Sequence, residues 1–135
     1  MEQSPVARVQ SELSDEPWPP LGFERIVLVN GRHAPALSAS VAAVDADAAP
    51  VVPERTRHAR FGWLNDAFAT DLARLSVTGQ RRIELLFIAT PVDAPQAQHP
   101  RLELAVLPGS SLTLVERHLG DAGDNSLINV AAQLH

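Results

Sequence analysis

The stretch from residue 83 to residue 89, Ile-Glu-Leu-Leu-Phe-Ile-Ala, constrains the fold more than any other part of this chain. Apart from Glu84, apolar residues occupy both phases of the run, so a strand here would be apolar on both faces. Such a strand needs cover on each side, as in stacked or sandwiched sheets. The sequence therefore predicts a layered β structure.

Further short strands precede and follow this one, separated by glycine or proline. Residues 72–77 and 102–106 alternate apolar and polar side chains, the period of a half-buried strand. Residues 112–118 and 127–134 predict two more strands. A succession of short strands predicts a mainly β fold, and the pattern alone leaves a sandwich, a barrel and a β-helix open.

A tight hairpin is predicted upstream of these strands. Residues 23–29 form an aliphatic run that ends in Asn30-Gly31. This dipeptide favours a two-residue hairpin turn, because both turn positions need positive φ. The returning strand should be short, since Pro35 has no N–H for a ladder.

A short helix is predicted over residues 61–69. Phe61, Leu64 and Phe68 recur at the spacing of one helical face. The preceding residues, 36–59, are rich in alanine, proline and scattered charge, which indicates a surface loop.

Composition narrows the classes of function. The chain has 11 Lys+Arg, all of them arginine, against 16 Asp+Glu, and its net charge of −5 disfavours nucleic-acid binding. It contains no cysteine, which excludes disulfides and thiolate chemistry. The first residues lack the character of a signal peptide, and the longest apolar run, 85–89, is too short to span a membrane. We therefore expect a cytoplasmic protein without membrane or nucleic-acid partners.

Candidate acids and bases are scattered, and no GxSxG, P-loop, GxGxxG or HExxH motif is present. The candidate acids and bases are His33, His58, His99, His118, His135, Glu103, Glu116, Asp66 and Asp71. Four of them, His99, Glu103, Glu116 and His118, fall on or beside two strands expected to pair. No catalytic constellation emerges, and the serines at 110–111 are interpreted as turn caps.

Three of these residues suggest an alternative metal site. Glu116 and His118 are two residues apart, so they share a strand face, and with His99 they could ligate a metal as in a cupin. The HxH pair usual in cupins is absent. A solvated polar face is the favoured interpretation, and no metal or catalytic residue is assigned.

Five stretches, taken in order, resemble a known family. They are residues 29–38, 64–71, 85–91, 99–120 and 127–133. Together they resemble the N-terminal part of SufD, a member of the SufB/SufD family of iron–sulfur cluster assembly scaffold proteins. The sequence departs from the family pattern at Leu72, where glycine is usual.

The resemblance implies a partial right-handed parallel β-helix with a small N-terminal α+β region. The implied organisation is a flexible or helical segment at 1–22, a region with hairpin, loop and helix at 23–71, and the start of the β-helix core at 72–135. A small β-sandwich or barrel is the alternative that the strand pattern leaves open.

The resemblance also implies a scaffold and not an enzyme. Such a subunit acts through protein–protein interaction with SufB-like subunits and the SufC-like ATPase, which hydrolyses the ATP. Family members continue beyond the position of His135, and the family's functional histidine has no counterpart here, so no site residue and no cofactor is assigned to this chain. An open β-helix end would also favour homo-oligomers. The other functions considered are a cupin-like metal-binding domain and a purely oligomerising structural module.

Overall fold

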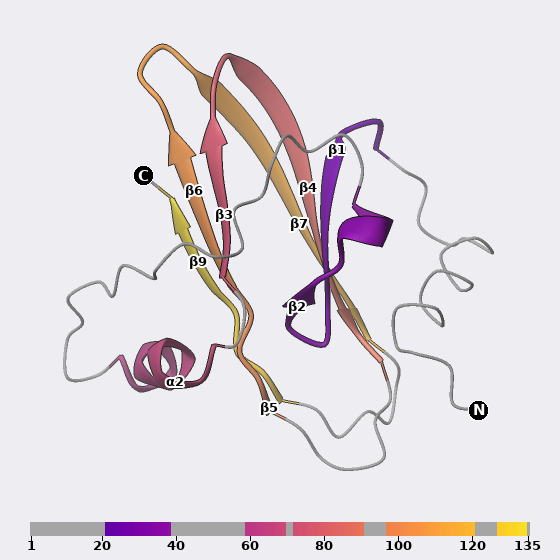
Figure 1. Cartoon of the computed structure of the whole chain (residues 1–135), viewed down its shortest axis with the longest axis vertical. Coiled ribbons are helices and arrows are strands. Elements are labelled where there is room, and N and C mark those ends of the chain that lie inside the picture. The colour runs from indigo at the N-terminus through magenta and orange to yellow at the C-terminus, as the bar shows by residue number, and fades with distance from the viewer. Residues whose placement is uncertain (1–20, 39–58, 70–71, 91–96, 121–126, 135) are drawn as a thin grey trace.

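A computed structural model of the chain describes residues 21–38, 59–69, 72–90, 97–120 and 127–134. The predicted N-terminal segment (1–22) and the predicted loop at 36–59 lie largely outside these residues. The described chain is mainly β, as predicted, with one α-helix and one short 3-10 helix (Figure 1). The strands are β1 Glu24–Val29, β2 Arg32–His33, β3 Leu72–Val77, β4 Gln80–Ala89, β5 Ala97–Gln98, β6 Arg101–Val106, β7 Ser111–Gly120, β8 Leu127–Ile128 and β9 Ala131–Leu134; the helices are η1 Pro35–Leu37 and α2 Arg60–Phe68.

The strands form three sheets. Sheet A has the order β2-β1-β4-β7, sheet B the order β3-β6-β9, and sheet C contains β5 and β8. Every pairing is parallel except that of β1 with β2. No sheet closes on itself within the described residues, so they form no barrel.

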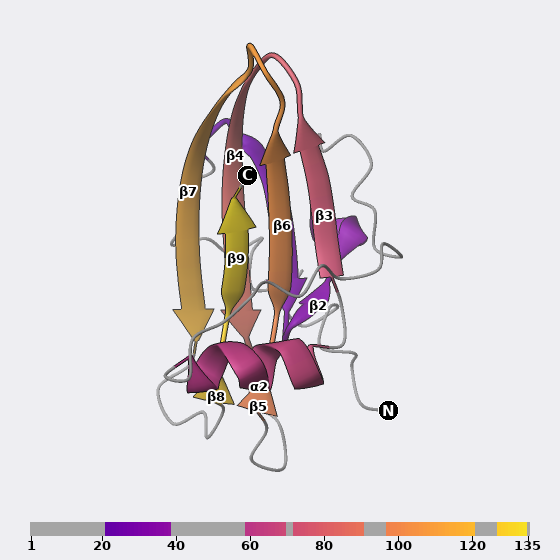
Figure 2. The same cartoon turned by 90° about the vertical axis from the view of Figure 1, so that its left-hand side faces the viewer.

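The chain passes through the three sheets in a repeating order. Strands β3, β4 and β5 lie in sheets B, A and C, and β6, β7 and β8 repeat that order before β9 returns to sheet B. Strands of successive passes pair at a separation of about 30 residues, within the range of solenoid repeats. Figure 2 shows the later strands lying beside the earlier ones.

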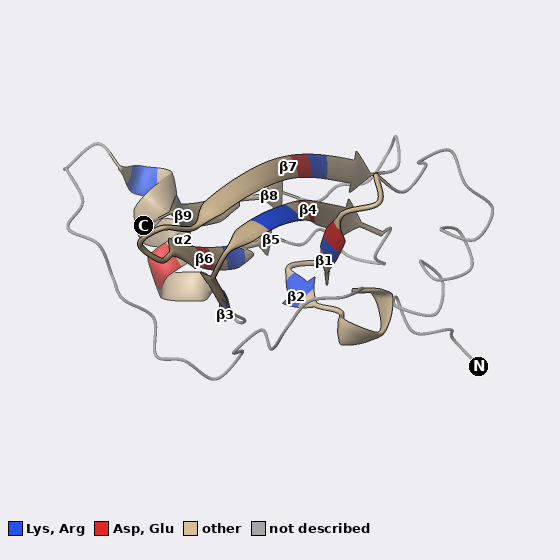
Figure 3. Cartoon of the chain, turned by 90° about the horizontal axis from the view of Figure 1, so that it is seen from above, with Lys and Arg blue, Asp and Glu red and all other residues tan. Residues whose placement is uncertain are grey.

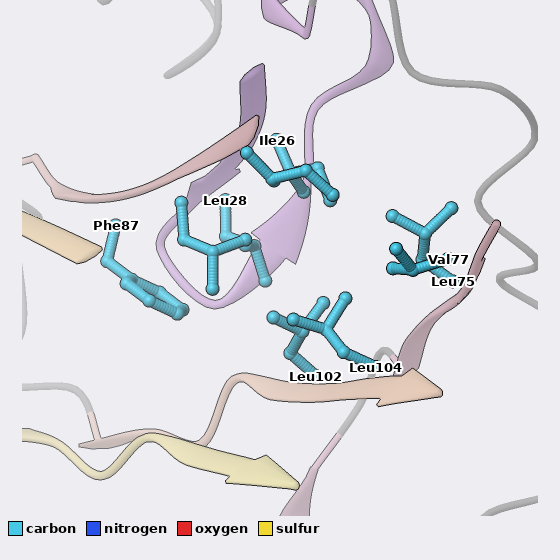
Figure 4. Packing of buried hydrophobic residues seen from close by; sticks show 9 residues of the cluster. Ile26, Leu28, Leu75, Val77, Phe87, Leu102 and Leu104 are labelled. Atoms are coloured by element: carbon cyan, nitrogen blue, oxygen red, sulfur yellow. The ribbon is translucent and has the colours of Figure 1, made fainter. Parts of the chain in front are cut away.

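The main core lies between sheets A and B (Figure 4). Its buried side chains are Ile26, Leu28, Leu75, Val77, Ile83, Leu85, Phe87, Leu102 and Leu104. A second cluster, which includes Val27, Leu86 and Ile88, occupies the other face of sheet A. Strand β4 is therefore buried on both faces, and the prediction for residues 83–89 is confirmed.

The Asn30-Gly31 hairpin is confirmed. Both residues have positive φ, 49° and 81°, and Val29 pairs with Arg32 across the turn. The turn also packs on the next pass: the Asn30 side-chain oxygen accepts hydrogen bonds from the Thr90 N–H (2.9 Å) and from Gln98 Nε2 (3.2 Å). The same side chain donates to Thr90 Oγ1 at 2.7 Å. One asparagine thus shapes the turn and fixes it to the next part of the chain.

The helix is confirmed within one residue, but apolar packing does not hold it. Phe61 and Phe68 are 65% and 62% exposed. Polar contacts fix the helix instead: Asn65 is fully buried, and Asp66 forms an ion pair with buried Arg101 at 2.8 Å. The apolar face that the spacing predicts is present, and it points to solvent.

Asn65→Ala is expected to lower the free energy of unfolding by about 2 kcal/mol, because it removes both hydrogen bonds of a fully buried side-chain amide; the Pro100 carbonyl keeps its hydrogen bond from the Ala131 N–H. The Asn65 Nδ2 group donates to the carbonyl oxygens of Pro100 (3.0 Å) and Asn129 (2.8 Å). Urea unfolding measures the loss, and amide exchange should show α2 opening first. Arg60→Ala, at an exposed position of the same helix, is the control and should change stability by less than about 0.5 kcal/mol. Equal stabilities for the two variants would contradict this anchoring.

The prediction of one strand over 127–134 is wrong. The chain turns at Asn129 and Val130, so β8 lies in sheet C and β9 in sheet B. The Asn129 N–H donates to the Gln98 carbonyl (2.8 Å), which satisfies the backbone at this corner. The corner contains neither glycine nor proline, so the sequence gives no signal for it.

No helix among the described residues is long and apolar enough to cross a membrane.

Candidate functional site

The expected pairing of the two strands that carry the His/Glu cluster is wrong. Strand β6 pairs with β3 and β9, whereas β7 pairs with β4. The turn at residues 107–110 moves the chain from sheet B to sheet A and forms no hairpin. Glu103 on β6 is therefore in a different sheet from Glu116 and His118 on β7.

Glu116 and His118 do share a face of β7 and contact each other. His118 Nε2 lies 2.5 Å from Glu116 Oε1. The imidazole also stacks on Phe87, its register partner on β4, with ring centroids 4.9 Å apart. Both polar side chains remain more than a third exposed, so they form a solvated pair on an edge strand.

His99 belongs to a different environment. Its Nδ1 lies 3.1 Å from Asn129 Nδ2, and its ring lies against that of Phe68, with 5.7 Å between centroids. Within the described ranges, no three His, Cys, Asp or Glu side chains are placed to hold a metal ion. The structure therefore does not assemble the alternative site of His99, Glu116 and His118.

The remaining candidates have structural partners or lie outside the described residues. His33 Nε2 contacts Ser38 Oγ (3.3 Å), and Asp66 pairs with Arg101. The turn serine Ser110 accepts a hydrogen bond from the Gly79 N–H (2.9 Å), which joins its turn to the one between β3 and β4. The candidates outside the described ranges are His58, Asp71 and His135.

Two buried glutamates join neighbouring strands: Glu84, which was not among the sequence candidates, and Glu103, which was a candidate but not for this role. Glu84 on β4, 1% exposed, contacts Arg25 of β1 (2.9 Å) and Arg117 of β7 (3.1 Å). Glu103 on β6 contacts Arg74 of β3 (2.5 Å). Figure 3 shows the charged positions on β1, β4 and β7. The position of Glu84 within the apolar run 83–89 could have indicated this pairing, because a buried carboxylate needs a cation beside it.

The candidate interaction surface is the edge formed by β7 and β9, which we call the stack end. Its residues Leu114, Glu116 and His118 are the register partners of Ile83, Leu85 and Phe87 in the core. On β9, Ala132 and Leu134 are the partners of core residues Leu102 and Leu104.

The stack end exposes the positions that the preceding strands bury. Leu114 is 36% exposed and Leu134 is 63% exposed, while their counterparts on β4 and β6 are buried. Each of the two strands is also paired on only one side in the described sheets. Unpaired strand edges with apolar side chains are typical binding surfaces for another strand.

A second apolar surface lies on α2, where Phe61, Trp63, Leu64 and Phe68 are all exposed. Exposed apolar groups of this kind mark interaction surfaces. Comparison of the chain with protein-family models, curated proteins and solved structures gave no match. The geometry thus provides two surfaces suited to protein contacts.

Proposed function

We propose that the chain is the N-terminal part of a SufD-like scaffold subunit for iron–sulfur cluster assembly. It acts in the cytoplasm through protein–protein interaction with SufB-like and SufC-like subunits, and it is not itself an enzyme. The proposal begins from the five resembling stretches, and the arrangement of the strands and the stack end support it.

In this proposal the stacked passes are the first rungs of a right-handed parallel β-helix. The support is the parallel pairing of β3, β6 and β9 in one sheet and of β4 and β7 in another. A nearly constant separation of about 30 residues is characteristic of solenoid folds, in which each repeat contacts only its neighbours. The β1–β2 hairpin and α2 would then form the small region that precedes the core.

The stack end is the observation that carries the interaction role. Leu134 lies on β9, an edge strand, and is largely exposed. A further strand that covers it would remove this apolar surface from water, which favours binding. In a longer subunit the next rung of the same chain would cover this edge; for the chain alone, the partner would be a further β strand from a SufB-like subunit or from a second copy. Nascent clusters are usually held by thiolates, and this chain has none, so cluster ligands would come from the partner.

The test is binding of the purified chain to purified SufB-like and SufC-like subunits, measured by size-exclusion chromatography with light scattering. Leu134→Arg should weaken binding at least tenfold, because it places a charge on the face that the partner would cover. Leu107→Arg, at an exposed leucine in the turn after β6, is the matched control and should bind normally.

The outcomes separate the candidate functions. Self-association through the stack end without binding to either subunit would replace the scaffold proposal with the purely oligomerising module. A monomer that binds neither subunit would overturn both.

A further inference from the structure

A wide-open surface cavity of about 520 Å³, lined mostly by exposed residues, lies at the N-terminal ends of β4 and β7, beside the start of β1 on sheet A. It is lined by Gly22, Phe23, Glu24, Gln80, Arg81, Arg82, Ser111 and Thr113. The scaffold proposal gives this cavity no role, and it is separate from the stack-end side chains of Leu114, Glu116 and His118.

The strand register places four polar side chains together in this cavity. Gln80 pairs with Ser111, and Arg82 pairs with Thr113. Because residues two apart on a strand share a face, both pairs point to the same side of sheet A. Their side chains offer the guanidinium donors, an amide and two hydroxyls.

The two arginines of the cavity differ in their partners. Arg81 Nε donates to both carboxylate oxygens of Glu24, at 3.1 and 3.0 Å, so its charge is neutralised. The contact of Arg82 is the ring of Phe23, 5.9 Å from the guanidinium carbon. No described carboxylate pairs with Arg82, so among the described residues its positive charge is uncompensated.

We propose that this cavity binds an oxyanion, a carboxylate or a phosphate group, with Arg82 as its principal ligand. A guanidinium presents paired N–H donors that match two oxygens of either group. The Phe23 ring supports Arg82 by a cation–π contact and leaves the edge of the guanidinium available. Ser111 and Thr113 donate hydroxyl hydrogen bonds to the remaining oxygens.

The experiment is an NMR titration of the full chain that follows backbone amides and arginine Nε–H signals. Sodium phosphate and sodium succinate are added separately, with sodium chloride at matched ionic strength as the reference. Saturable shifts at Arg82, Ser111 and Thr113 with either anion support the site. Stronger binding of phosphate would identify the phosphate class, because a tetrahedral group uses the hydroxyls, and stronger binding of succinate would identify the carboxylate class.

Variants distinguish the cavity from general attraction to positive charge. Arg82→Gln should weaken binding at least tenfold, and Thr113→Val should weaken it by a smaller factor. Arg60→Gln, at an exposed arginine on α2, should bind as the unchanged protein does. Arg82 and Thr113 are both exposed, so these variants keep the fold. Absence of saturable shifts, or equal weakening by Arg60→Gln, would overturn the proposal.

Discussion

Leu85→Ala is expected to lower the free energy of unfolding by about 2–5 kcal/mol. Leu85 is fully buried in β4 and belongs to the core between sheets A and B. Its truncation removes apolar contacts and leaves a cavity that strands fixed in a parallel register cannot easily fill. Urea unfolding monitored by circular dichroism measures the loss.

Leu107→Ala provides the matched control for this prediction. Leu107 is 42% exposed and follows the end of β6, so the same truncation should cost less than about 1 kcal/mol. Equal midpoints for Leu85→Ala and the unchanged protein would show that the two sheets do not enclose this side chain.

Glu84→Ala is expected to cost about 3 kcal/mol, the lower end of the range for breaking a buried ion pair. The variant leaves the guanidinium groups of Arg25 and Arg117 without their carboxylate. The lower end applies because these arginine side chains are 18% and 19% exposed and so keep part of their hydration.

Glu116→Ala is the control for Glu84→Ala, since both remove a glutamate that contacts a cationic or titratable partner. The Glu116–His118 pair is largely exposed, and its loss should cost no more than about 1 kcal/mol. Thermal unfolding at low and high salt measures both variants. A loss for Glu84→Ala no larger than that for Glu116→Ala would contradict the role of Glu84 as a buried link between strands.

Local chemistry made several elements predictable. Asn30-Gly31 has few alternatives to a tight hairpin, because both residues accept positive φ. The run from 83 to 89 contains too few polar residues for any exposed face, and the structure buries both of its faces. The spacing of Phe61, Leu64 and Phe68 predicted α2 because helical periodicity is set within a few residues.

The arrangement of these elements was not predictable from their patterns. Alternation with a period of two is the same in parallel and antiparallel pairs, so it could not show that β6 and β7 belong to different sheets. The apolar face of α2 could be recognised in the sequence, but the sequence could not show whether anything packs against it. In the structure this face is exposed, and Asn65 and Asp66 anchor the helix. The candidate metal site failed for the same reason, because sequence spacing cannot place His99 relative to another sheet.

The parallel passes also determine the order in which contacts can form during synthesis. Arg25 of β1 meets Glu84 of β4 across 59 residues, whereas later strands meet the previous pass across about half that separation. The N-terminal hairpin can close as soon as it leaves the ribosome, but β1 has no parallel partner until β4 has been made. From β6 on, each new strand pairs with a strand that has already been made. Strand β1 therefore remains without its parallel partner for the longest stretch of synthesis, and the later strands add to the sheets in the order in which they are made.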